Sequence, residues 1–191
     1  MDALSIALIT AALVLLAVLA VFVYSYNRLF RFRNAADAEL GQVRVAMKKR
    51  FDMIEQLLGA VQGYTKFERE VFEKVASLRA QVMSAGPQAL ADMQKESANL
   101  FGSIRAVAEA YPDLKASETV KKLMDAIVSN EDEIARQRYT YNNVVQEFNT
   151  MVDTIPTNFV AGVLSMRKLE YLQFGEEIEA APKVTGIGPN G

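Results

Sequence analysis

The distribution of hydrophobic and polar residues divides the chain into an uncharged apolar start and a long region with helical periodicity. Residues 3–24 contain no ionisable group except the phenol of Tyr24. At ~1.5 Å per residue, this run is long enough to cross a bilayer core of ~30 Å. Asp2 stands before the run and "FVYSYN" is a poor cleavage site, which argues against a secretory signal. We therefore expect residues 1–24 to form an uncleaved transmembrane anchor, in preference to a cleaved signal or a buried core helix.

Basic residues follow the apolar run at close spacing. Arg28, Arg31 and Arg33 come soon after it, whereas only the terminal amine precedes it. The positive-inside rule then favours an N-terminus outside the cell and a cytoplasmic body. Together with Tyr24, the three arginines are predicted to anchor the helix at the interface between the lipid bilayer and water.

Helical periodicity continues over most of the remaining chain. Apolar residues recur every three or four positions, and segments with proline or glycine separate four stretches. The predicted helices span about 25–84, 88–110, 117–155 and 157–175, and residues 177–191 are expected to be disordered. The predicted fold is all-α: an N-terminal transmembrane helix that continues into a long-helix antiparallel four-helix bundle.

The unequal lengths of these helices predict an uncovered segment. If the first helix runs to residue 84 and the connection at 111–117 is extended, the later helices flank it only from about residue 46. Residues 46–176 would then form the bundle, and residues 25–45 a juxtamembrane helical stalk without a partner from its own chain. A long exposed apolar face is typical of an interface. The candidate self-association stripe comprises Leu29, Phe32, Ala36, Leu40 and Val43.

The composition of the chain removes several classes of site. Cysteine, histidine and tryptophan are absent. Their absence excludes disulfides, thiolate nucleophiles, zinc sites built on cysteine or histidine, and Ser-His or Cys-His catalytic pairs. A formal charge of −2 gives no reason to expect nucleic acid binding. The "GIGPNG" sequence at 186–191 has no strand before it, so we reject it as a phosphate cradle. No catalytic residue, metal or cofactor is expected.

Charged residues within the apolar stripes are the candidates for a polar site. Arg50 and Asp52 flank a core position of the first helix, and Glu131 and Arg138 interrupt the stripe of the third. Charges beside a core need partners, because an isolated buried charge is costly. We predict that these four residues form an interhelical network. Such a network would set the register of the bundle, and the alternative is a binding site for a ligand or partner.

An aromatic residue followed by asparagine occurs at residues 26–27, 141–142 and 148–149. The last two occurrences lie one heptad apart on the third predicted helix. We interpret the pattern as packing, in which the aromatic ring faces inward and the asparagine forms a local or interhelical hydrogen bond.

Five segments of the chain carry a family resemblance: "YNRLFRFRN", "QVRVAMKKRFDMIEQLLGAVQGYTKFE", "AEAYPDLKAS", "NEDEIARQRYTYNNVVQEFN" and "IPTNFVA". In these segments the chain resembles the LemA family of bacterial and archaeal membrane proteins. The resemblance implies a single anchor in a prokaryotic inner membrane, a long-helix bundle and the same topology, and it brings no catalytic residues. Glu55 stands where many members have proline, which predicts a straighter first helix.

These observations predict a single-pass, membrane-anchored scaffold or interaction protein without catalytic activity. It is expected to self-associate through its stalk as a coiled-coil homo-oligomer, or to bind another membrane protein. The alternative is a membrane-tethered sensor or ligand-binding module with a polar site between helices, although a small-molecule ligand is not the first expectation. An enzyme restricted to carboxylate, lysine, tyrosine or serine chemistry is the third class.

Overall fold

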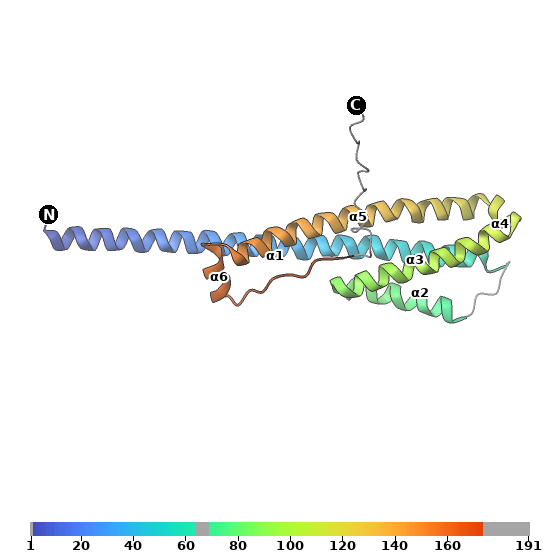
Figure 1. Ribbon diagram of the computed structural model, residues 1–191, viewed down its shortest axis with the longest axis horizontal. Helices are drawn as coiled ribbons and strands as arrows, with labels where there is room; N and C mark the ends of the chain where they lie inside the picture. The colour runs from blue at the N-terminus through green and yellow to red at the C-terminus, as the bar shows by residue number, and fades with distance from the viewer. Residues whose placement is uncertain (1, 64–68, 174–191) are drawn as a thin grey trace, which may run out of the picture. The chain divides into compact units, whose positions relative to one another are not determined.

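A computed structural model of the protein describes residues 2–63 and 69–173, and within these ranges its regular structure is helical (Figure 1). The prediction of an all-α fold is confirmed. The predicted disordered tail lies outside the described residues. The helices are α1 (Ala3–Val61), α2 (Arg69–Gln81), the 3-10 helix η1 (Val82–Ser84), α3 (Pro87–Ala110), α4 (Pro112–Ala116), α5 (Glu118–Asp153) and α6 (Thr157–Val163).

The described residues fall into two compact units. Unit 1 takes its residues from Met1–Ala46 and Glu131–Tyr171, and unit 2 from Met47–Asn130 and Leu172–Gly191. The two longest helices, α1 and α5, therefore contribute residues to both units.

The helix α1 is continuous from Ala3 to Val61 and passes through Glu55 without a break. It contains a segment that is long and apolar enough to cross a membrane, and none of that segment is buried inside the protein. A core helix of a soluble protein would bury such a segment, because exposed apolar area is costly in water. The residues predicted to form an anchor are therefore helical, apolar and exposed in the structure.

The predicted single helix over residues 25–84 is wrong, because α1 ends at Val61. The chain then returns along α1 as α2. Arg79, near the end of α2, forms an ion pair with Asp52 and a second one, at 3.6 Å, with Glu55 of α1. The two helices are therefore antiparallel neighbours within unit 2.

The apolar stripe beyond Val61 packs against α1 and does not lengthen it. Val75 of α2 is fully buried in the same core as Leu58 of α1. A helix that continues and a helix that folds back have the same spacing of apolar residues, so periodicity does not distinguish them. Gly63 stands two residues after Val61, and glycine is common just beyond a helix end. The prediction relied on the absence of proline and did not use this signal.

Unit 2 packs parts of α1, α2, α3 and α5 around one core. Lys74 of α2 and Glu96 of α3 form an ion pair at 2.5 Å. Pro87 occupies the first turn of α3 as predicted, where its missing N–H costs no hydrogen bond. The predicted break at 111–117 contains the short helix α4, so this connection is compact and not extended. The buried residues of the core are Ile54, Leu57, Leu58, Val61, Val75, Leu100, Ile104, Ala108, Leu114, Val120 and Ile127.

In unit 1, the second half of α5 lies along the part of α1 that follows the apolar segment (Figure 1). Phe148 and Met151 of α5 share a core with Leu29 of α1. The expectation that residues 25–45 lie uncovered is therefore wrong. The prediction failed because it assumed a first helix longer than α1 and an extended connection at 111–117, where the structure has the short helix α4. The stripe residues Leu29, Ala36, Leu40 and Val43 are buried, and Phe32 is partly buried.

The predicted fourth helix over 157–175 is also wrong, because α6 ends at Val163 and the following described residues are not helical. Backbone hydrogen bonds close the end of the helix, from the N–H of Met166 to the carbonyl oxygen of Ala161 and from the N–H of Ser165 to that of Gly162, at 2.9 and 3.1 Å. Ser165 has a φ of 51°. This pattern is a Schellman motif with serine where glycine is usual, so its signal is absent from the sequence.

The residues after α6 form an extended segment that is fastened to α5. The side-chain amide of Asn149 donates to the carbonyl oxygen of Leu169 at 3.0 Å and accepts from the N–H of Leu169 at 2.8 Å. The hydroxyl of Tyr141 donates to the carbonyl oxygen of Glu170 at 2.8 Å. These bonds agree with the packing interpretation of the pairs at 141–142 and 148–149: Tyr141 and Phe148 are buried, and Asn149 bonds to another segment.

Candidate functional site

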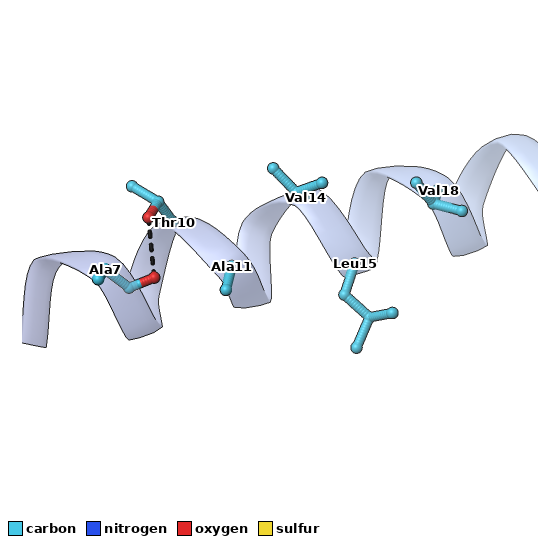
Figure 2. Close-up of a pocket in the computed structure, with 6 residues that line it drawn as sticks. All are labelled: Ala7, Thr10, Ala11, Val14, Leu15 and Val18. Atoms are coloured by element: carbon cyan, nitrogen blue, oxygen red, sulfur yellow. Dashed lines mark hydrogen bonds between the residues drawn. The ribbon is translucent and has the colours of Figure 1, made fainter. Parts of the chain in front are cut away.

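The apolar segment of α1 is the strongest functional feature among the described residues. Its large side chains are exposed, as Leu13 and Leu16 illustrate with exposed fractions of 60 and 61%. The hydroxyl of Thr10 donates to the carbonyl oxygen of Ala7 at 2.9 Å, which satisfies this polar group within the helix (Figure 2). A hydroxyl that bonds to its own backbone is compatible with a lipid environment. The segment therefore has the properties of a membrane-spanning helix.

One side of this segment has a shallow depression at its small residues. Figure 2 shows Ala7, Thr10 and Ala11 on the helix together with three larger residues, Val14, Leu15 and Val18. The surface is nearly all apolar, and no other described segment covers it.

The predicted interface anchors lie where α1 leaves the apolar segment. Tyr24, Arg31 and Arg33 are exposed and Arg28 is half-buried. Ser25, next to Tyr24, is fully buried within unit 1. Packing of the chain against α1 therefore begins one residue after the predicted anchor, so the exposed apolar part and the protein-covered part of the same helix adjoin each other.

The four predicted members of a polar network have different surroundings. Asp52 forms an ion pair with Arg79, a partner that the sequence did not suggest. Glu131 is exposed and Arg138 is half-buried. A helix that is covered on one side only leaves some positions of its stripe in water, and Glu131 is such a position. Arg79 could have been found only from the return of α2 along α1.

Arg50 is a buried charged residue in unit 2. Its side chain is 2% exposed, and burial lowers the pKa of the guanidinium to about 10. The group is still charged at neutral pH. A buried cation favours one arrangement of the residues around it, because moving or removing these residues leaves the charge in a poorly solvated site.

Tyr141 is the second perturbed group. Burial raises its pKa to about 12, the carboxylates of Asp37 and Glu170 add to the rise, and Arg44 opposes it. All four residues belong to unit 1. The neutral phenol is therefore the stable form, consistent with its donating a hydrogen bond to the backbone at Glu170.

An open groove of about 400 Å³ lies on unit 2, between α3, α4 and α5. Its floor includes Phe101 and Met124, which also pack against the core of unit 2. Arg105 at its rim is paired with Glu109 at 2.9 Å. Its remaining lining residues are Ala108, Lys115, Lys121, Asp125 and Val128.

Within residues 2–63 and 69–173, no group of three or more acidic side chains is arranged to hold a metal ion.

Sequence reasoning missed the exposed apolar surface of α6. Phe159 and Val163 fall within the predicted fourth helix, and in the structure they are 66 and 73% exposed. The preceding residue Ile155 is 75% exposed. Helical spacing identifies an apolar face, but the buried face of α6 is formed by its neighbours Thr157, Val160 and Ala161.

An all-α chain with a long apolar helix exposed at one end and packed helices after it defines a membrane-associated helical protein. The sequence profile of the LemA family matches residues 39–185, and the chain belongs to the LemA family. The resemblance noted in the sequence is confirmed by this match.

Named relatives are similar over most of their length. Protein LemA of Metamycoplasma hominis is 27% identical over 158 residues, which cover 82% of this chain and 72% of the relative. Magnetosome protein MamQ 2 of Paramagnetospirillum magneticum is 22% identical, with 87% of this chain and 71% of the relative covered. Magnetosome protein MamQ of Magnetospirillum gryphiswaldense is 20% identical, with coverages of 84 and 69%.

Proposed function

We propose that the protein is a single-pass, non-catalytic scaffold that holds helical surfaces next to a membrane for contact with other proteins. The observation that carries the proposal is the continuity of α1, which extends from the apolar segment into both units without a break. A continuous helix holds the residues along it at fixed distances from the apolar segment, because it rises ~1.5 Å per residue. The names of the relatives specify no reaction, which supports a role other than catalysis.

The proposed orientation places the N-terminus outside and both units in the cytoplasm of a prokaryotic cell, at the inner membrane. The arginines at 28, 31 and 33 support it through the positive-inside rule. Because the chain has no cysteine, single substitutions report on one position each. Asp2→Cys should react with a membrane-impermeant maleimide in intact cells, whereas Tyr139→Cys should react only after permeabilisation. The opposite labelling pattern would reverse the orientation.

The proposed partner is a second copy of the chain or another membrane protein. Leu29, Ala36 and Val43 of the predicted self-association stripe are buried within the chain. The surface through which two copies would meet is therefore left open. Crosslinking in intact membranes, followed by mass spectrometry of the products, tests for both kinds of partner. A chain that stays monomeric in light scattering at micromolar concentration and yields no crosslinked protein would refute the scaffold proposal.

A second candidate function is ligand binding in the groove on unit 2. The groove combines an apolar floor with the lysines at 115 and 121, which favours an anionic amphiphile. Decanoate is a suitable probe, and it should raise the melting temperature of the full chain. Lys121→Glu should abolish this rise, whereas Lys122→Glu, at the neighbouring position outside the groove lining, should retain it. An unchanged melting temperature of the native chain excludes this candidate for such ligands.

A further inference from the structure

Exposed apolar residues lie on one face of α6 and in the turn before it. Phe159 and Val163 are four residues apart on α6 and therefore share a face, and Ile155 precedes them in the turn. Their exposed fractions are 66, 73 and 75%. The opposite face is buried, since Val160 and Ala161 pack in the core of unit 1. This short helix thus carries apolar residues on both faces, and the described residues cover only one of them.

The packing of unit 1 places α6 near the point where α1 leaves the apolar segment. Val160 and Ala161 share a core with Leu29 of α1. Figure 1 shows α6 beside α1 at the end of α5. From Val23 to Leu29, α1 rises by only ~9 Å, and the polar interface of a bilayer adds ~5–7 Å to each side of its hydrocarbon core. The exposed face of α6 is therefore within side-chain reach of a bilayer that contains the apolar segment.

The course of α5 supports this placement. The charges of Asp37 and Arg44 on α1 act on the phenol of Tyr141. Further along α5, Phe148 shares a core with Leu29, which comes earlier on α1. The helix α5 therefore runs antiparallel to this part of α1, and the chain that follows it proceeds towards the apolar segment. The complete burial of Ser25 agrees, because a serine on an isolated helix would be exposed.

Hydrogen bonds fix α6 in this position. The hydroxyl of Thr157 lies 2.5 Å from the carbonyl oxygen of Met151 and 2.9 Å from that of Thr154. The ion pair between Lys168 and Asp153, at 2.6 Å, ties the segment after α6 to the end of α5. The exposed apolar face is thus presented by a fastened element and not by a free loop.

We propose that α6 is a membrane-interface helix whose Ile155, Phe159 and Val163 insert into the boundary between headgroups and acyl chains, in the leaflet through which α1 leaves the bilayer. The occupant of this face is phospholipid. Aromatic side chains favour this depth, and the exposed basic residues Arg31 and Arg167 are suited to anionic headgroups. The inference rests on α1 crossing a bilayer and is independent of the proposed orientation and scaffold role.

Tryptophan fluorescence tests the proposal, because the chain contains no tryptophan of its own. In the full-length chain in nanodiscs of phosphatidylcholine and phosphatidylglycerol, Phe159→Trp should show blue-shifted emission and lose fluorescence when the lipids are brominated near the headgroup end of their acyl chains. The matched control is Tyr139→Trp on α5, a position of unit 1 with a similar exposure of 69%. It should emit as in water and resist quenching.

Three results decide the matter. Quenching of Phe159→Trp but not of Tyr139→Trp supports insertion into the bilayer. Water-like emission from Phe159→Trp overturns the proposal, and so does a blue shift without quenching by brominated lipid, which indicates burial against protein. Val163→Trp provides a second reporter on the same face if Phe159→Trp does not give native helical content, and the same outcomes apply to it.

Discussion

Ser165 adopts a backbone conformation that most residues avoid. With a φ of 51° it occupies the left-handed region, where the Cβ of an L-residue is crowded by the backbone. The two hydrogen bonds that close α6 require this conformation, and Met166 packs in the core of unit 1 as a result. The strain is therefore offset by the packing of the residue that follows.

Replacing Ser165 with glycine should relieve this strain. We expect Ser165→Gly to raise the free energy of unfolding of the full chain by about 1 kcal/mol, because glycine tolerates the left-handed region. Chemical denaturation in detergent solution, followed by circular dichroism, measures the change. Ser165→Ala retains a Cβ and should show no gain, and equal stability of the two variants would contradict this interpretation.

The phenol of Tyr141 should make the stability of the chain depend on pH at the alkaline end. Its pKa is raised to about 12 in the folded chain, against ~10 in the unfolded chain. Below pH ~10 both states hold the proton, and the stabilisation is fully present. Between pH ~10 and ~12 the unfolded state releases the proton while the folded state keeps it, so the free energy of unfolding falls across this window.

The variant Tyr141→Phe removes this proton and should lose less stability than the native chain over the same pH window. The comparison cancels the contributions of lysines and other tyrosines, which titrate in both proteins. Tyr139→Phe is the control, because the phenol at 139 is 69% exposed on the same helix. Its pH profile should match that of the native chain, and a native profile for Tyr141→Phe would refute the assignment.

At the scale of elements, one amide makes two of the hydrogen bonds that hold the extended segment after α6. Asn149→Ala would leave both backbone groups of Leu169 without their partner. We expect a loss of about 1–3 kcal/mol in the free energy of unfolding and faster hydrogen exchange at Leu169. Asn143→Ala changes an exposed asparagine of the same helix and should change neither quantity. Native exchange at Leu169 in Asn149→Ala would show that the segment is held by other contacts.

The buried face of α1 in unit 1 gives a prediction that separates packing from self-association. Leu29 is 0% exposed, so Leu29→Ala should cost about 2–5 kcal/mol through lost contacts and a cavity. Leu13→Ala, in the exposed apolar segment, is the control and should leave the unfolding of the units unchanged in detergent. If Leu29→Ala altered only the mass of the particle in light scattering, Leu29 would be an interface residue after all.

Local signals predicted several elements of the fold. The apolar run identified the exposed segment of α1, Pro87 marked the start of α3, and the aromatic–asparagine pairs at 141–142 and 148–149 indicated packing. These features depend on residues close in sequence, for which propensity and side-chain volume are sufficient guides.

Features that depend on a distant partner were not predictable in the same way. The return of α2 along α1 is fixed by the burial of Val75 against Leu58, which periodicity alone leaves open. The partner of Asn149 lies 20 residues away in a segment without regular structure. The sequence could not identify the covered face of α6 because both faces carry apolar residues, and only packing decides which one is buried.

At the scale of the whole molecule, three arginines carry the prediction of orientation. Replacing Arg28, Arg31 and Arg33 together with glutamine removes the excess of positive charge after the apolar segment. We expect the variant to lose its uniform orientation, so that the cysteine of Tyr139→Cys becomes partly accessible to impermeant maleimide in intact cells. Glutamine at three exposed positions of unit 1, 140, 143 and 150, provides a background with the arginines and the cysteine at 139 intact. Unchanged protection in the arginine variant would assign the orientation to another part of the chain.

The unbroken course of α1 also couples rotation to height. Each residue inserted between Tyr24 and Ser25 would turn unit 1 by ~100° about the helix axis and raise it by ~1.5 Å above the bilayer. Seven inserted residues would nearly restore the angle while adding ~10 Å of height. The number of residues in α1, and not only their chemistry, therefore sets which side of unit 1 faces the lipid surface and at what distance.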